Sequence, residues 1–205
     1  MKTLVIIFSV LLLAVSSNSF AGKPVKVKVS QDAFVQGGET SDEAFGLTKD
    51  GRLRVMKSNG TDKYSRISYL QFNLKKIESI ESATLNLCVR VFPSKNDASA
   101  QFSLNVYACE NNKWSETGIT FDNKPEKAEL LATEVLPVND DNSWISISIP
   151  ADKLKALKEK SKKGKVTLVL ANDDFNRTSI EVISKERTWS NGMAAKREAY
   201  LKILP

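Results

Sequence analysis

Apolar and polar residues alternate with a period of two through most of the chain after residue 22. Valines alternate with lysines across 25–29, and isoleucines alternate with serines across 145–149. Similar short runs lie at 53–55, 70–74, 166–170, 180–182 and 201–203. Because successive side chains of a β-strand point to opposite faces, each run predicts a strand with one buried face.

The runs are rich in β-branched residues, and clusters of Gly, Asn, Asp or Pro separate them, as is typical of antiparallel sheets. Only the stretch Pro150–Lys158, which ends before Gly164, has a credible helical pattern. The sequence contains no linker-like segment and no clear repeat. We therefore predict an all-β fold, a two-sheet antiparallel β-sandwich of jelly-roll type with one short helix, formed by residues 22–205 as a single domain.

The first 21 residues have the parts of a secretory signal peptide. Lys2 supplies the positive charge, Leu4–Val15 is almost unbroken apolar sequence, and Ser19 and Ala21 are small residues at the cleavage site. The apolar run is too short for a bilayer span, which takes roughly 20 residues. We expect cleavage after Ala21, secretion to an extracellular or periplasmic location, and no membrane insertion.

The composition narrows the partners and the chemistry. The sequence has 30 Lys and Arg residues against 24 Asp and Glu residues, a net charge of +6. The polyanions available to an exported basic protein are acidic polysaccharides, teichoic acids or lipid headgroups, so we expect no nucleic-acid partner. So small an excess of positive charge also fits a role in solubility alone. The absence of histidine excludes His-based metal sites and Ser-His-Asp or Cys-His catalysis, but it leaves carboxylate mechanisms open.

The two cysteines, Cys88 and Cys109, are expected to form a disulfide, because pairs of cysteines in exported proteins are usually oxidised. Each lies in an alternating run, on the side opposite the apolar residues. If the strands 83–91 and 102–109 pair with one another, the two sulfur atoms meet across them on a non-core face.

Several stretches resemble a known family. They are Asp32–Val35, Tyr64–Leu74, the Trp-Ser-Glu to Asn-Lys-Pro stretch Trp114–Pro125, and Ile183–Glu186 near the end; Asp50–Val55 also echoes the family signature. In this order they resemble the DNRLRE-type domain, which is grouped with carbohydrate-binding module family 96, over essentially the whole chain after the signal peptide.

This resemblance implies a non-catalytic β-sandwich that binds an acidic polysaccharide, most often alginate or a similar polyuronate. Modules of the family are usually attached to a lyase or other enzyme, so we consider a separate polysaccharide-degrading enzyme or a cell-envelope component as a further partner. Two other functions stay open: a structural or adhesive envelope protein that binds a protein or cell-surface polymer, and a lyase or glycosidase that uses Tyr64 with Arg66 or a carboxylate pair.

A polyuronate site needs cations for the sugar carboxylates and polar groups for the hydroxyls. Polar residues that continue the inward phase of a strand beyond its apolar part should crowd the open end of the sandwich. On this basis we predict a single patch of ligand-binding residues: Lys57, Tyr64, Arg66, Asn172, Lys185 and Arg187.

Other interpretations apply to some of these cations. Arg66 and Glu186 are equally explained as a buried ion pair that closes the end of the sandwich, because a buried charge needs a partner. Arg52 and Arg54 lie in the opposite phase and fit a solvated face.

Aromatic and acidic residues give weaker candidates. We expect Trp114 to anchor a long loop, Trp144 to belong to the core, and Trp189 to be the best sugar platform. We predict no cofactor, with structural calcium as the one alternative, for which the pairs 140–141 and 173–174 supply carboxylates although neither has an EF-hand pattern.

Overall fold

The computed structural model describes residues 22–92, 101–175, 178–188, 192–193 and 196–205. The predicted signal peptide, residues 1–21, and Trp189 lie outside these residues. Within the described part of the chain, no helix is long and apolar enough to cross a membrane. The elements are β1 (Val25–Gln36), β2 (Arg52–Val55), β3 (Arg66–Asn73), β4 (Ser82–Phe92), β5 (Gln101–Cys109), β6 (Leu130–Pro137), β7 (Asn139–Ile149), α1 (Ala151–Lys160), β8 (Lys165–Ala171), β9 (Ser179–Ile183) and β10 (Tyr200–Leu204).

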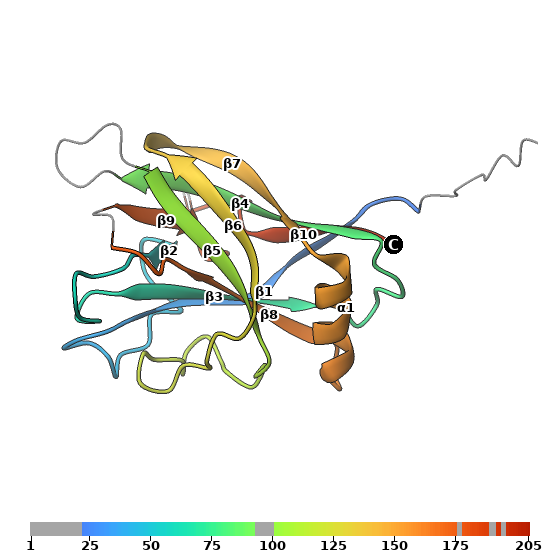
Figure 1. Ribbon diagram of the computed structural model, residues 1–205, viewed down its shortest axis with the longest axis horizontal. Coiled ribbons are helices and arrows are strands. Elements are labelled where there is room, and N and C mark those ends of the chain that lie inside the picture. Colours follow the sequence, from blue (N-terminus) through green and yellow to red (C-terminus); the bar gives the residue numbers. More distant parts are fainter. Residues whose placement is uncertain (1–21, 93–100, 176–177, 189–191, 194–195) are drawn as a thin grey trace, which may run out of the picture.

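The described strands form two layers, and all pairs of neighbouring strands within each layer are antiparallel. Sheet A contains β2, β9, β4, β7, β10 and the first part of β1; sheet B contains the rest of β1 followed by β3, β8, β5 and β6. The chain crosses repeatedly from one sheet to the other, as in a jelly roll. Helix α1 lies at one end of the sandwich, and β2 and the loop after β1 lie toward the other (Figure 1). The predicted fold class and helix are confirmed.

Strand β1 belongs to both sheets. Its residues Val25 to Lys28 pair with β10 in sheet A, whereas Val29 to Gln36 pair with β3 in sheet B. The change occurs at a register shift between Val29 and Gln31, where an extra residue bends the strand. The bend brings the end of β1 beside β2 and β3, where the candidate site lies.

The inner faces of the two sheets enclose the main core, which is built from the alternating residues that the sequence pattern predicts. Leu85, Leu87 and Val89 of β4 face Leu168 and its neighbours in sheet B, and all are almost fully buried. A second, smaller core lies on the outer face of sheet B, beneath the loop that joins β5 to β6. This loop therefore has a packed underside.

The structure contradicts the predicted disulfide, since both cysteines are free and buried. Cys88 lies in β4 of sheet A, where it is opposite Trp144 of β7, and Cys109 belongs to the small core outside sheet B. The sequence pattern places each cysteine correctly on a non-core face. However, the chain changes sheets between β4 and β5, so the two thiols lie on opposite outer faces. Burial raises the pKa of both thiols, which keeps them protonated and unreactive.

The tryptophans differ in their surroundings. Trp114 is buried in the small core, donates from its indole N–H to the Thr167 hydroxyl over 3.0 Å, and packs edge-on against Tyr69. Its predicted role as the anchor of a long loop is confirmed. The prediction that Trp144 belongs to the core is wrong: it shares the outer face of sheet A with Cys88, is 47% exposed, and packs against Tyr200.

Candidate functional site

An open cavity of about 540 Å³ lies where the end of β1, the loop 44–50, β2 and the start of β3 meet. We call it the arginine pocket. Its lining combines three cations, two stacked aromatic rings and several uncharged polar groups: Phe34, Gln36, Ala44, Phe45, Leu47, Thr48, Lys49, Asp50, Arg54 and Arg66.

Aromatic rings form the apolar part of the arginine pocket. Phe34 and Phe45 stack with ring centroids 4.9 Å apart, and a backbone bridge between the same two residues holds the loop against β1. Gly46 follows at a point where a β-carbon would lie 1.9 Å from the carbonyl oxygen of Glu116, so only glycine allows this approach. The guanidinium of Arg54 lies 5.2 Å from the Phe34 ring centroid, a cation–π arrangement.

Arg66 is the unusual group of the arginine pocket. It is half-buried and donates from Nε to the Gln36 amide oxygen over 2.6 Å. Among the described residues, no carboxylate lies within ion-pair distance of its guanidinium. Burial lowers the pKa of Arg66, and the neighbouring Arg54 lowers it further. Because arginine stays protonated, an incoming anion would relieve this unfavourable positive charge.

The other charges of the arginine pocket leave a positive excess. Arg54 forms an ion pair with Asp50 and approaches Glu181 at 3.8 Å. Lys49, Arg54 and Arg66 are the lining cations and Asp50 is the lining anion. The lining residues therefore carry a net charge of two positive units, which suits a ligand that carries carboxylates.

The alternative interpretation, an Arg66–Glu186 ion pair, is wrong. The guanidinium of Arg66 bonds to Gln36, whereas the carboxylate of Glu186 accepts from the Ser184 hydroxyl over 3.1 Å and from Lys185. Arg66 lies at the start of β3 and Glu186 in the turn after β9. Strand phase gave both residues an inward direction, but it could not show which partner each side chain contacts.

A second cavity lies beside the outer face of sheet B, and it contains Lys57 and Asn172. Lys57 pairs with Asp62 over 2.9 Å, and Lys127 pairs with Asp173. Its other lining residues include Lys124 and Glu126. The lining carries three lysines against the three acids Asp62, Glu126 and Asp173, so this cavity lacks the net positive charge of the arginine pocket.

Asp173, which belonged to a predicted calcium pair, is held by other groups. Tyr107 and Asn105 donate to its carboxylate, and Lys127 forms an ion pair with it. Burial alone would raise the pKa of Asp173, but these bonds outweigh burial and lower it. Within the described chain, neither this carboxylate nor the pair 140–141 belongs to a cluster of three acidic side chains.

The structure divides the six predicted ligand residues among several places instead of one patch. Arg66 lines the arginine pocket, and Lys57 and Asn172 line the second cavity. Tyr64 is 53% exposed beside Lys63, and it lines neither cavity. The remaining two are tied to backbone or acidic partners: Arg187 donates to the carbonyl oxygen of Asp50, and Lys185 pairs with Glu116 and Glu186.

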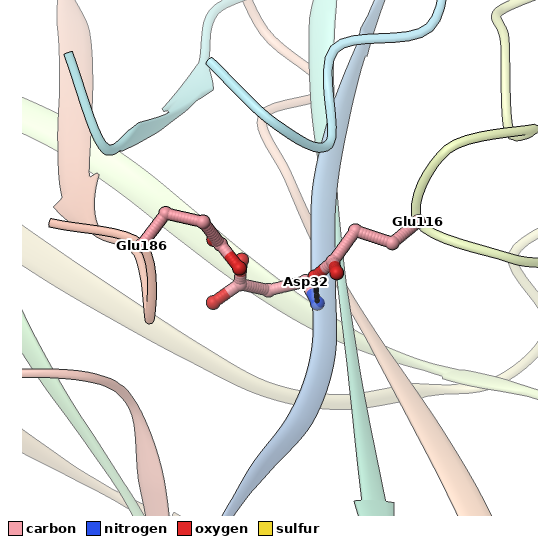
Figure 2. Close-up of side chains that lie close together, drawn as sticks. All are labelled: Asp32, Glu116 and Glu186. Carbon is pink, nitrogen blue, oxygen red and sulfur yellow. Dashed lines mark hydrogen bonds between the residues drawn. The ribbon is translucent and has the colours of Figure 1, made fainter. Parts of the chain in front are cut away.

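Lys185 belongs to a cluster that the sequence analysis missed. Asp32 of β1, Glu116 of the long loop and Glu186 of the turn after β9 point toward one another (Figure 2). Asp32 is fully buried, and its backbone N–H donates to Glu116 Oε1 over 2.8 Å. Burial raises the pKa of Asp32 well above its usual range, and the charge of Glu186 adds to this shift. The available signal was an acidic residue directly before the apolar run Ala33–Val35.

The outer face of sheet A carries a different surface. Trp144 of β7 and Tyr200 of β10 pack edge to face with centroids 5.5 Å apart, and the Lys26 ammonium lies 3.8 Å from the Tyr200 ring centroid. These three side chains form an aromatic surface with one cation. This surface lies away from the arginine pocket, so its residues serve as controls in binding experiments on that pocket.

Comparison with protein families shows that this β-sandwich is a carbohydrate-binding module. The chain belongs to carbohydrate-binding module family 96, whose model matches residues 23–202. The match spans both sheets and all the cavities described above. Comparison with curated proteins finds no match.

Solved structures with similar backbones include the xylan-binding module CBM15, which is 12% identical with a TM-score of 0.45 over 88% of this chain and 97% of that one. Two cleaved adhesin domains of Lys-gingipain from Porphyromonas gingivalis are 11% and 10% identical, with TM-scores of 0.37 and 0.39. They align with 89% and 87% of this chain and with 99% of their own lengths.

Proposed function

We propose that this protein is a secreted, non-catalytic module that binds an acidic polysaccharide, with alginate or a similar polyuronate as the ligand, through the arginine pocket. The observation that carries the proposal is the unpaired guanidinium of Arg66 beside Arg54. A planar guanidinium matches a carboxylate with two parallel hydrogen bonds, and a polyuronate offers one carboxylate per sugar. The partly exposed ring of Phe45, which stacks on the buried ring of Phe34, supports the proposal by giving the apolar face of a sugar ring a surface to contact.

The composition of the arginine pocket favours binding without turnover. A polyuronate lyase must neutralise a carboxylate and remove the neighbouring proton, which requires a base. Among the described lining residues of this pocket there is no tyrosine, the sequence has no histidine, and Asp50 is held in an ion pair with Arg54. The lyase alternative based on Tyr64 with Arg66 lacks support, since Tyr64 does not line this pocket.

The test uses the mature chain, residues 22–205, and calorimetric titration with an alginate oligomer, its carboxyl-reduced counterpart and a neutral glucan. We expect binding to the acidic oligomer only, weakening as salt rises, because exposed charges are screened over about 10 Å at 0.1 M. Equal affinity for the carboxyl-reduced oligomer would show that carboxylates are not what is recognised. Production of unsaturated ends in the same mixture would show that the module is an enzyme.

A further inference from the structure

The cluster of Asp32, Glu116 and Glu186 has the geometry of a cation site. One oxygen from each of the three carboxylates can be chosen so that all lie within 4.8 Å of one another. Oxygen ligands of calcium lie at about 2.3–2.6 Å, so two ligands on opposite sides of one ion are roughly 5 Å apart. The spacing of the three carboxylates is therefore compatible with one shared ion.

Asp32 gives an independent indication of a missing ligand. Its side chain is fully buried, and Oδ2 accepts from the backbone N–H of Lys185 over 2.9 Å. The other oxygen, Oδ1, is buried and has no hydrogen-bond partner. Buried carboxylate oxygens are almost always paired, because leaving one unpaired costs about 1–3 kcal/mol or more. An ion bound to Oδ1 would supply the missing partner.

The charges around the cluster point to a divalent ion. With all three carboxylates ionised, as an ion would require, they carry three negative charges, and Lys185, which lies 2.9 Å from Glu116 Oε2 and also contacts Glu186, contributes one positive charge. The cluster then keeps a net charge of two negative units at a largely buried position. A divalent cation would neutralise that net charge, and ligands that are all carboxylate oxygens favour calcium over zinc or copper.

We propose that Asp32, Glu116 and Glu186 bind a calcium ion that joins β1, the β5–β6 loop and the turn after β9. The ion would fix these three segments to one another at the same end of the sandwich as the loop that carries Gly46, whose backbone approaches the carbonyl of Glu116. The site is separate from the arginine pocket and concerns stability, so its test does not depend on whether the module binds a polyuronate.

The experiment measures thermal melting of the chelator-treated mature protein during titration with calcium and, separately, magnesium at constant ionic strength. We expect the melting temperature to rise with calcium and to level off by about 10 mM, which is roughly tenfold above the dissociation constants of about 0.1–1 mM of extracellular calcium modules, with a smaller response to magnesium. Glu186→Gln preserves the volume of the side chain and should need at least tenfold more calcium for the same rise. Asp140→Asn, an exposed acid on β7, is the matched control and should respond like the wild type.

Lys185 provides the decisive variant, because its ammonium competes for the same carboxylates. If the cluster binds calcium, Lys185→Met should melt lower without calcium and gain more than the wild type when calcium is added. If Lys185 is instead the permanent cation of the cluster, calcium will leave the wild-type melting temperature unchanged and will not restore the variant. That second result would overturn the proposal.

Discussion

Replacing Arg66 by alanine separates a ligand-binding arginine from a structural one. The side chain makes one hydrogen bond, to Gln36, and has no carboxylate partner among the described residues. Its removal therefore leaves no buried charge unpaired, and it also relieves the repulsion with Arg54. We expect the free energy of unfolding to fall by no more than about 2 kcal/mol, in the range of one hydrogen bond to a charged group.

The effect of Arg66→Ala on binding should be larger. A charge-assisted contact to a carboxylate contributes about 1.5–3 kcal/mol, which corresponds to a loss of affinity of roughly tenfold to a hundredfold. Arg66→Lys keeps the charge but loses the planar fork, so it should recover only part of that affinity. Lys57→Ala removes a cation that already pairs with Asp62, and it should change the affinity by less than about twofold.

The assay is calorimetric titration with an alginate oligomer, accompanied by thermal melts of each variant. For a domain of this size, each 1 kcal/mol shifts the melting temperature by about 2–4 °C. A fall of 10 °C or more for Arg66→Ala would mean that the residue holds the fold together, as one partner of a broken buried pair would at about 3–5 kcal/mol. Unchanged affinity with an intact fold would refute the assignment of Arg66 to the ligand.

Three further predictions concern the framework. Cys88 and Cys109 should resist thiol labelling in the native protein but label fully after denaturation without reductant, and an intact mass lower by two hydrogens would contradict this. Trp114→Ala should cost about 3–5 kcal/mol, whereas Trp144→Ala at an exposed position should cost much less; equal losses in denaturant titrations would contradict the assigned burial. The pKa of Asp173 is lowered because its hydrogen bonds outweigh burial, so the ionised carboxylate stabilises the fold above the unfolded pKa near 4. The wild type should therefore be more stable than Asp173→Asn at pH 7, and this difference should disappear as the pH falls through the lowered pKa of the folded state. A difference that persists at that low pH would contradict the assignment.

The fold could be predicted because strand phase is a local property. The alternation in β4 and β5 assigned residues such as Leu87 and Val106 to the core, and both are fully buried. The same alternation assigned Cys88 and Cys109 to non-core faces. It could not tell which sheet each strand joins, because sheet membership depends on crossovers between distant segments. The disulfide prediction failed at that step.

The candidate sites were less accessible to sequence reasoning, because each draws on several separate segments. Arg66 was identified from its inward phase, but its neighbours Phe45 and Lys49 come from a loop without periodicity. In the cluster around Asp32, Glu116 lies 84 positions after Asp32 in the chain, and Glu186 lies 154 positions after it. A buried acid in a strand signals that a partner must exist, but it does not reveal which one.

The most direct test of the central claim is an NMR titration that follows side-chain N–H signals as an alginate oligomer is added to the mature protein. If the glycan carboxylate binds in the arginine pocket, the Nε–H signals of Arg54 and Arg66 should shift in a saturable manner, while the indole signal of Trp144 on the outer face of sheet A stays in place. Saturable shifts at Trp144 with both arginine signals unchanged would contradict the account.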